Sequence, residues 1–197
     1  MKLIEQKYEW GGGLSSRPAT KYIILHHRGG DGDAMSIHKQ HLRNGWSGIG
    51  YHFYVRKDGT VYTGRPVSRI GAHCDGYNSF SVGICFEGNY EKERTMPDAQ
   101  KKAGQELVSY LKELFPHAEV KGHKSFVSTA CPGRYFPLDE IKEGKVMKKE
   151  LTSANDITWE LSQMIEINDV DGFVKALDKA KRDNSPLYWG FRKIVNK

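Results

Sequence analysis

The hydrophobic positions of this chain follow two different spacings, one typical of strands and the other of helices. Continuous or alternating apolar runs predict strands, whereas apolar residues three and four apart predict amphipathic helices. Strands that alternate with helices indicate an α/β fold, a mixed central β-sheet flanked by helices. The segments expected as strands are 22–25, 51–56, 60–63, 81–87 and about 119–121, and those expected as helices are 34–45 and 97–116.

The most informative strand prediction is the one over residues 22–25. This run is continuously apolar, which is typical of a buried central strand, and it leads directly into His26 and His27. Further along, Asp58-Gly59 separates two alternating runs and predicts a hairpin turn. Residues 1–20 are polar and interrupted by glycines, so they are expected to form an irregular lead-in.

The pattern changes near residue 143, which divides the chain into two predicted parts. Residues 1–146 form the main domain, and residues 153–197 read as a small all-helical module of three short helices. About 45 residues are few for an independent hydrophobic core. The module is therefore expected to pack on the main domain or on a second copy of itself.

Composition supports a folded protein with a basic surface. Of the 197 residues, 38% are hydrophobic and 27% are charged, which allows a buried core. Lysine and arginine number 30 against 24 acidic residues, a formal net charge of +6 that suits an anionic polymer as partner. The basic residues lack an accompanying pattern of stacking aromatics, so no nucleic-acid partner is expected.

The cellular compartment of the protein is indicated by features that the sequence lacks. A run of about 18 apolar residues, as a membrane span requires, does not occur, and residues 1–7 have no apolar core of a secretory signal. Three cysteines are too few for a disulfide framework. We therefore expect a protein that is made and kept in a cytoplasm, in which a cysteine with a special role is a ligand or a thiol.

Two histidines and one cysteine stand at positions that suit a metal site. His26 ends the predicted central strand, His123 follows another strand, and Cys131 comes eight residues later. Two imidazoles and a thiolate satisfy the usual ligand count of a catalytic zinc site, which leaves the fourth tetrahedral position to water. The spacing differs from that of a zinc finger. Taken alone, it leaves open that these residues are core histidines and a small buried hydrophobe.

Five short motifs, taken in order, resemble one family. The set resembles the zinc-dependent N-acetylmuramoyl-L-alanine amidases, which include phage endolysins and peptidoglycan recognition proteins, and the likeness covers roughly residues 20–142. Each motif alone is weakly specific, but the ordered set is specific. The motifs are Ile23–His27, Gly50–Phe53, Gly71–His73, Tyr77–Ile84 and Thr129–Gly133.

The resemblance implies roles for particular positions. The family's zinc ligands match His26, His123 and Cys131, and the tyrosine that assists the zinc-bound water or the oxyanion matches Tyr51. The position two before the cysteine is lysine in some members and threonine in others. Here it is Thr129, which can offer a hydrogen bond but no positive charge.

Four further residues are candidates for substrate contact or proton transfer. His73 and Asn78 match positions that line the family's groove, and Trp46 precedes the Tyr51 strand, where it could contact a sugar or stem peptide. For Trp46, ordinary packing is an equal alternative. Glu87, at the end of its predicted strand, is a possible proton shuttle to the leaving amine, and its alternative is a solvated strand end.

The implied activity is hydrolysis of the amide between N-acetylmuramic acid and L-alanine of peptidoglycan, with Zn²⁺ as cofactor. The resemblance implies a phage or prophage endolysin that waits in the host cytoplasm until lysis and then cuts the cell wall, expected to be Gram-positive. Members that only bind peptidoglycan typically lack the cysteine, so Cys131 favours catalysis. The alternatives are a non-catalytic peptidoglycan-binding module and an intracellular muropeptide-recycling amidase. The C-terminal helices are expected to target the wall or to form a homodimer.

Overall fold

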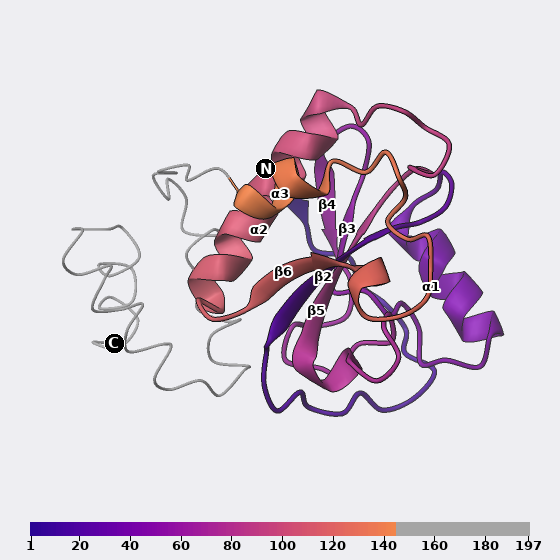
Figure 1. Ribbon diagram of the computed structural model, residues 1–197. Helices are drawn as coiled ribbons and strands as arrows, with labels where there is room; N and C mark the ends of the chain where they lie inside the picture. The colour runs from indigo at the N-terminus through magenta and orange to yellow at the C-terminus, as the bar shows by residue number, and fades with distance from the viewer. Residues whose placement is uncertain (145–197) are drawn as a thin grey trace, which may run out of the picture. The chain divides into compact units, whose positions relative to one another are not determined.

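A single six-stranded mixed sheet organises the protein in the computed structural model, which describes residues 1–144 (Figure 1). The strands lie in the order β1-β4-β3-β5-β2-β6, and all neighbours run parallel except β3 and β4. The mixed central sheet predicted from the sequence is thereby confirmed. The strands are β1 (Lys2–Ile4), β2 (Tyr22–His27), β3 (Phe53–Val55), β4 (Thr60–Thr63), β5 (Ser81–Phe86) and β6 (Glu119–Gly122).

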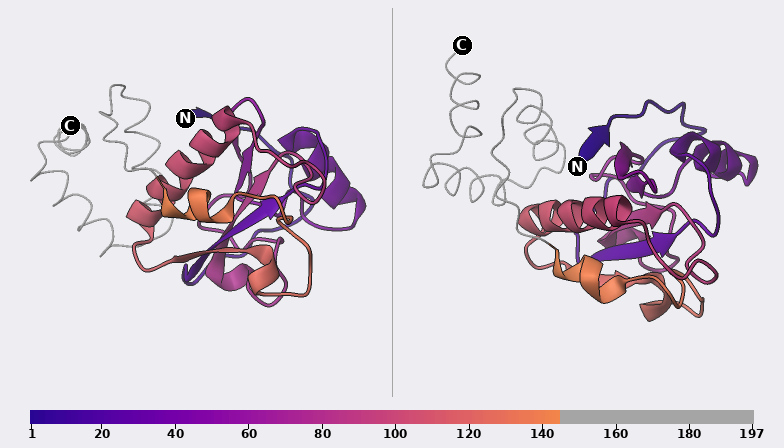
Figure 2. Two further views of the ribbon diagram at one scale, coloured as in Figure 1. Left: turned by 45° about the horizontal axis from the view of Figure 1, so that its top comes forward. Right: turned by 90° about the horizontal axis from the view of Figure 1, so that it is seen from above.

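Helices cover both faces of the sheet (Figures 1 and 2). Helix α1 (Ala34–Arg43) packs Ile37 in one cluster with Cys85 of β5. Successive side chains of a strand point to opposite faces, so the next residue of β5, Phe86, faces the other helices. There it packs over Gly104 of α2 (Asp98–Leu114), beside which lies α3 (Leu138–Glu143).

The run predicted as the central strand is β2, which lies between β5 and β6. Ile23, Ile24 and Leu25 are fully buried because helices and neighbouring strands cover them on all sides. The strand continues through His26, which pairs in register with Cys85. A continuous apolar run thus delivers a histidine to the carboxyl edge of the sheet, where the loops after the parallel strands gather.

Two elements differ from the sequence prediction. The polar lead-in contains β1, a three-residue edge strand parallel to β4, and helix α3 was not expected. Both are too short to show a period: β1 offers only Leu3 and Ile4, and α3 buries only Ile141. The predicted helical module over 153–197 lies outside the described residues. Within residues 1–144, no helix has the length and apolarity needed to cross a membrane.

Candidate metal centre

The three predicted metal ligands meet at one point. One ligand atom from each of His26, His123 and Cys131 lies within 4.8 Å of the others. The imidazole rings of the two histidines are 4.3 Å apart between centroids, and His26 Nδ1 is 3.8 Å from Cys131 Sγ. His26 is almost completely buried, while the other two ligands are partly exposed and give access from the solvent side.

The topology of the sheet explains why residues 97 positions apart converge. Strands β2 and β6 are parallel neighbours, so His26 near the end of β2 and His123 just after β6 lie at the same edge. The short 3₁₀ helix η2 (His123–Ser125) then turns the chain. The backbone N–H of Lys124 donates to the carbonyl oxygen of Cys131 at 2.9 Å, which brings the cysteine loop back to the site.

The donor set fits zinc. Two imidazole nitrogens and one sulfur supply the three protein ligands of a catalytic zinc site, and bonds of about 2.0 and 2.3 Å at tetrahedral angles place N and S about 3.5 Å apart. The separation of 3.8 Å between His26 Nδ1 and Cys131 Sγ is close to that value. Burial lowers the pKa of His26, which favours the neutral imidazole that binds metals, and raises the pKa of Cys131 to about 11. Metal binding must therefore displace the thiol proton.

Tyr51 borders the centre. Tyr51 stands two residues before β3, and its ring centroid lies 5.2 Å from that of His26. Burial, with the nearby thiols of Cys85 and Cys131, raises the pKa of the Tyr51 hydroxyl. The hydroxyl therefore keeps its proton at physiological pH and can donate a hydrogen bond, for which the buried Cys85 sulfur is one partner inside the protein.

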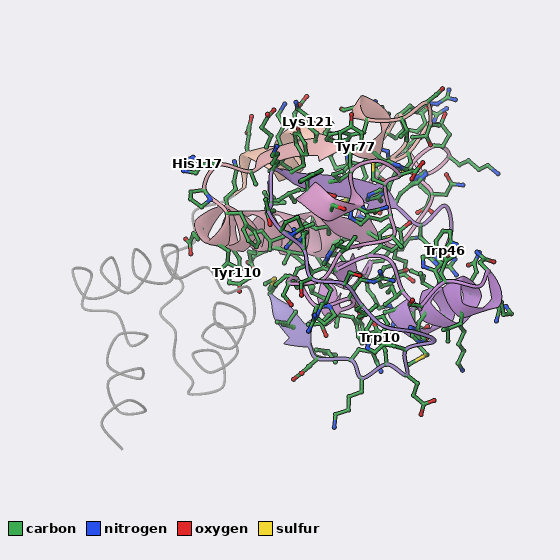
Figure 3. The ribbon with its side chains drawn as sticks, turned by 90° about the horizontal axis from the view of Figure 1, so that it is seen from below. Trp10, Trp46, Tyr77, Tyr110, His117 and Lys121 are labelled. Atoms are coloured by element: carbon green, nitrogen blue, oxygen red, sulfur yellow. The ribbon has the colours of Figure 1, made fainter. Side chains whose placement is uncertain are left out.

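The other exposed candidates lie around this point. Thr129 is exposed, and its Oγ1 accepts from the backbone N–H of Cys131 at 3.2 Å, which leaves its hydroxyl proton free for another acceptor. Trp46 lies beside α1 (Figure 3), and 47% of it is exposed. Its indole is 4.6 Å from the ring of His41, which in turn neighbours Tyr51 at 6.0 Å. Trp46 is therefore about half exposed and is linked to the centre through His41 and Tyr51, and its contact with substrate stays a prediction.

His73 and Asn78, predicted as substrate contacts, make their hydrogen bonds inside the protein. His73 Nδ1 is 3.0 Å from His26 Nε2. The side-chain oxygen of Asn78 accepts from the backbone N–H groups of His73 and Cys74 at 2.8 and 3.0 Å. Both residues thus belong to the framework behind His26, and the substrate role stays a prediction.

Glu87 is not the solvated strand end that the sequence allowed as an alternative. Its residue is only 4% exposed. One carboxylate oxygen accepts from the backbone N–H of Gly32 at 3.1 Å, and the other from the backbone N–H of Lys57 at 2.9 Å and from Arg56 Nε at 3.3 Å. The carboxylate therefore joins the loops that follow β2, β5 and β3, and this structural use competes with a proton-shuttle role.

Replacing Glu87 by alanine tests this bridging role. We expect Glu87→Ala to lower the free energy of unfolding by about 2–4 kcal/mol, because two backbone donors and a guanidinium lose their acceptor. Glu87→Gln, which keeps one oxygen, should lose less. Urea unfolding gives the stabilities, and hydrolysis rates are compared at a temperature where both variants are folded. A large loss of rate at unchanged stability would instead support the shuttle.

Sequence reasoning missed one residue that shapes the site. Arg65 is only 7% exposed, and its guanidinium donates to the carbonyl oxygens of Ile49 and Ile70 at 3.1 and 2.8 Å. These bonds hold in place the backbone that precedes Tyr51 and the backbone that precedes His73. The sequence shows only an arginine between Gly64 and Pro66. Arginine side chains are usually exposed to solvent, so nothing in the sequence indicated that this one is buried.

Buried neutral histidines predict an acid-sensitive fold. Burial lowers the pKa of His41 to about 4 and that of His52 well below its usual value, whereas in the unfolded chain both are near 6.5. Below pH 6.5 the unfolded chain binds protons that the folded chain does not, so stability is present above pH 6.5 and falls as the pH drops toward 4. Urea unfolding between pH 7.5 and 4.5 measures this slope.

A matched variant isolates one histidine. His41 Nδ1 accepts from the backbone N–H of Gly50 at 3.1 Å, and an asparagine oxygen can take the same place without being protonated. His41→Asn should therefore flatten part of the pH dependence. A stability that stays constant from pH 7 to 5 in the parent protein would contradict the account.

The comparisons with known proteins agree with this geometry. The family profile described as N-acetylmuramoyl-L-alanine amidase matches residues 15–134. The endolysin of Klebsiella phage KP32 is 37% identical over 140 residues, covering 65% of this chain and 93% of that protein. Peptidoglycan-recognition protein SC2 of Drosophila melanogaster is 33% identical over 148 residues, covering 66% of this chain and 80% of that protein.

A solved structure gives the same result for the fold. The N-acetylmuramoyl-L-alanine amidase LysC from Clostridium intestinale superimposes with a TM-score of 0.70 at 39% identity, covering 73% of this chain and 96% of that chain. The profile spans more than half of the residues and includes all three residues of the centre. The chain belongs to the N-acetylmuramoyl-L-alanine amidase family.

Proposed function

We propose that this protein is a phage endolysin that hydrolyses the amide bond between N-acetylmuramic acid and L-alanine of peptidoglycan. The observation that carries the proposal is the convergence of His26, His123 and Cys131 at an accessible edge of the sheet in a chain of this family. The endolysin of Klebsiella phage KP32 is similar to this chain over 93% of the endolysin's own length. The cofactor we propose is Zn²⁺, held by these three residues.

The reaction requires a strong nucleophile and relief of the negative charge that develops on the carbonyl oxygen. A bound zinc ion supplies Lewis acidity and brings the pKa of a coordinated water near 7. Tyr51 donates a hydrogen bond toward the developing oxyanion, which is where preorganised donors contribute most. The hydroxyl of Thr129 is a second donor, and like that of Tyr51 it carries no charge. Tyr51 is also the nearest candidate to deliver a proton to the leaving amine.

The substrate lies across the exposed side of the centre. The exposed part of the Trp46 indole offers an apolar wall to a sugar ring or to the stem peptide. The net positive charge of the chain favours an anionic wall, and we propose a Gram-positive one. We also propose His73 and Asn78 as substrate contacts. This role requires the substrate to extend to the inner edge of the metal centre.

We propose that the protein waits in the host cytoplasm and reaches the wall when the membrane is breached at lysis. Residues 1–146 are proposed as the catalytic domain. Residues 153–197 are proposed as a wall-targeting or self-association module, with a homodimer as the form that self-association would take.

The products of digested cell walls test the proposed reaction. Purified sacculi treated with the protein should release new amino termini of L-alanine without new reducing sugar ends. A non-catalytic binding module would bind the wall and release neither, and a recycling amidase would cleave small soluble muropeptides in preference to intact sacculi. New reducing ends would assign the protein to the glycosidases and contradict the proposal. Sacculi with lysine-type and diaminopimelate-type stems, compared at equal mass, test the wall preference.

A further inference from the structure

Behind the metal centre, a chain of hydrogen bonds leads from His26 into the protein. His26 Nε2 is 3.0 Å from His73 Nδ1. On the far side of that ring, His73 Nε2 is 3.4 Å from Ser81 Oγ, and the Ser81 hydroxyl donates to the carbonyl oxygen of Tyr77 at 2.8 Å. Four groups from β2, the loop after β4 and the start of β5 are thereby connected in one line.

The direction of these bonds follows from counting protons. The Ser81 hydroxyl uses its single proton on the Tyr77 carbonyl, so toward His73 it can only accept. His73 therefore carries its proton on Nε2 and presents a lone pair at Nδ1. His26 must then donate from Nε2, which leaves His26 Nδ1 without a proton. Nδ1 is the atom that lies 3.8 Å from Cys131 Sγ.

The opposite direction is disfavoured. It would require His73 to donate from both nitrogens and thus to carry a charge among buried groups, and it would place the His26 proton on the nitrogen that faces the sulfur. The ring of His73 is also held in place. A Cβ atom on Gly83 of β5 would lie 2.6 Å from His73 Cγ, so the ring occupies space that only glycine leaves free.

The loop that carries His73 is fixed independently of its side chain. Asn78, the first residue of the short 3₁₀ helix η1 (Asn78–Phe80), accepts from the backbone N–H groups of both His73 and Cys74. The backbone, the ring face and both ring nitrogens of His73 thus have defined partners inside the protein. A side chain so engaged is suited to orient a neighbour.

We propose that His73 is a positioning residue that fixes the tautomer and ring orientation of the metal ligand His26. The proposal rests on the proposed function only in taking the His26, His123 and Cys131 cluster as a metal site. An outer partner of this kind raises the basicity of the ligand and restricts its motion, and its loss typically weakens metal binding about 10–100-fold. In this role His73 acts on the reaction through His26, whereas the substrate contact predicted from the sequence would act on the substrate directly.

Two substitutions of His73, to side chains that match each other in shape, test the proposal. In His73→Asn the amide oxygen takes the place of Nδ1 and can accept from His26, whereas His73→Leu has the same branched shape without an acceptor. Competition with a chromophoric chelator measures the zinc dissociation constant of the full chain in the absence of substrate. We expect His73→Leu to weaken zinc binding about 10–100-fold and His73→Asn to weaken it less than about tenfold.

The tautomer itself can be observed without metal or substrate. Nitrogen-15 NMR of histidine-labelled, metal-free protein should show His26 protonated on Nε2, and should show a mixture of tautomers in His73→Leu. If His73→Leu does not fold, Ser81→Ala removes only the far acceptor and is expected to increase the proportion of the other tautomer. The parent spectrum tests the proposal in either case.

Specific results would overturn the proposal. Equal zinc affinities of the parent and both variants, with a raised KM for a soluble muropeptide, would make His73 a substrate contact. A parent His26 protonated on Nδ1 would also overturn it. Failure of the proposed function has a different signature: zinc affinity and tautomer respond as expected while no muramyl amide is cleaved.

Discussion

Replacing Cys131 by serine is expected to remove most of the bound zinc and with it the hydrolytic activity. The purified parent protein should contain about one zinc per chain, as one catalytic site implies. A serine hydroxyl is a much weaker ligand than a thiolate, so the two histidines would hold the ion alone. The loss of affinity should exceed the roughly 100-fold that removal of an outer partner causes. Metal analysis after gel filtration measures the content.

A second cysteine provides the control for this result. Cys74 is buried and free, and it does not belong to the cluster of ligand atoms. Cys74→Ser should therefore keep its zinc and its activity, apart from a small change in stability. Parent-like zinc content in Cys131→Ser would show that the cysteine is not a ligand and would contradict the assignment of the centre.

Removal of one hydroxyl, in Tyr51→Phe, is expected to slow hydrolysis strongly while the metal stays bound. Loss of a single oxyanion donor typically lowers kcat about 10²–10³-fold. Because the hydroxyl interacts mainly with charge that develops in the transition state, KM should change little. Steady-state kinetics on a soluble muropeptide, with zinc content measured on the same samples, separates the two effects.

The matched control is Tyr62→Phe. Tyr62 lies on β4, which β3 and β5 separate from the strand of His26. Removal of the Tyr62 hydroxyl should leave kcat close to that of the parent protein. A Tyr51→Phe variant with parent-like kcat and full zinc content would remove Tyr51 from the chemical step and leave Thr129 as the remaining side-chain donor from the sequence prediction.

The strands and main helices could be predicted because their patterns are long enough to be periodic. The apolar run of 22–25 and the turn at Asp58-Gly59 lie in the structure where the sequence places them. Strand β1 could not be predicted, since it is three residues long at the sheet edge, with its two apolar residues only partly buried. It forms because β4 offers an unpaired edge, which is a tertiary effect.

The metal ligands could be predicted for a different reason. His26, His123 and Cys131 belong to motifs whose order is specific, although spacing alone left a structural explanation open. The surroundings of the centre could not be predicted in the same way. That Gly83 makes room for the ring of His73, and that Glu87 joins three loops, depends on which strands become neighbours. A sequence read in one dimension does not contain that information in a local pattern.

Metal dependence of amide cleavage is the most direct test of the account. Sacculi are digested with the parent protein as purified, after removal of metal with EDTA and dialysis, and after addition of one equivalent of zinc. The account predicts that release of L-alanine amino termini is abolished in the stripped protein and restored by zinc, with no new reducing ends at any stage. Amine release that continues unchanged in protein shown to be free of metal would contradict it.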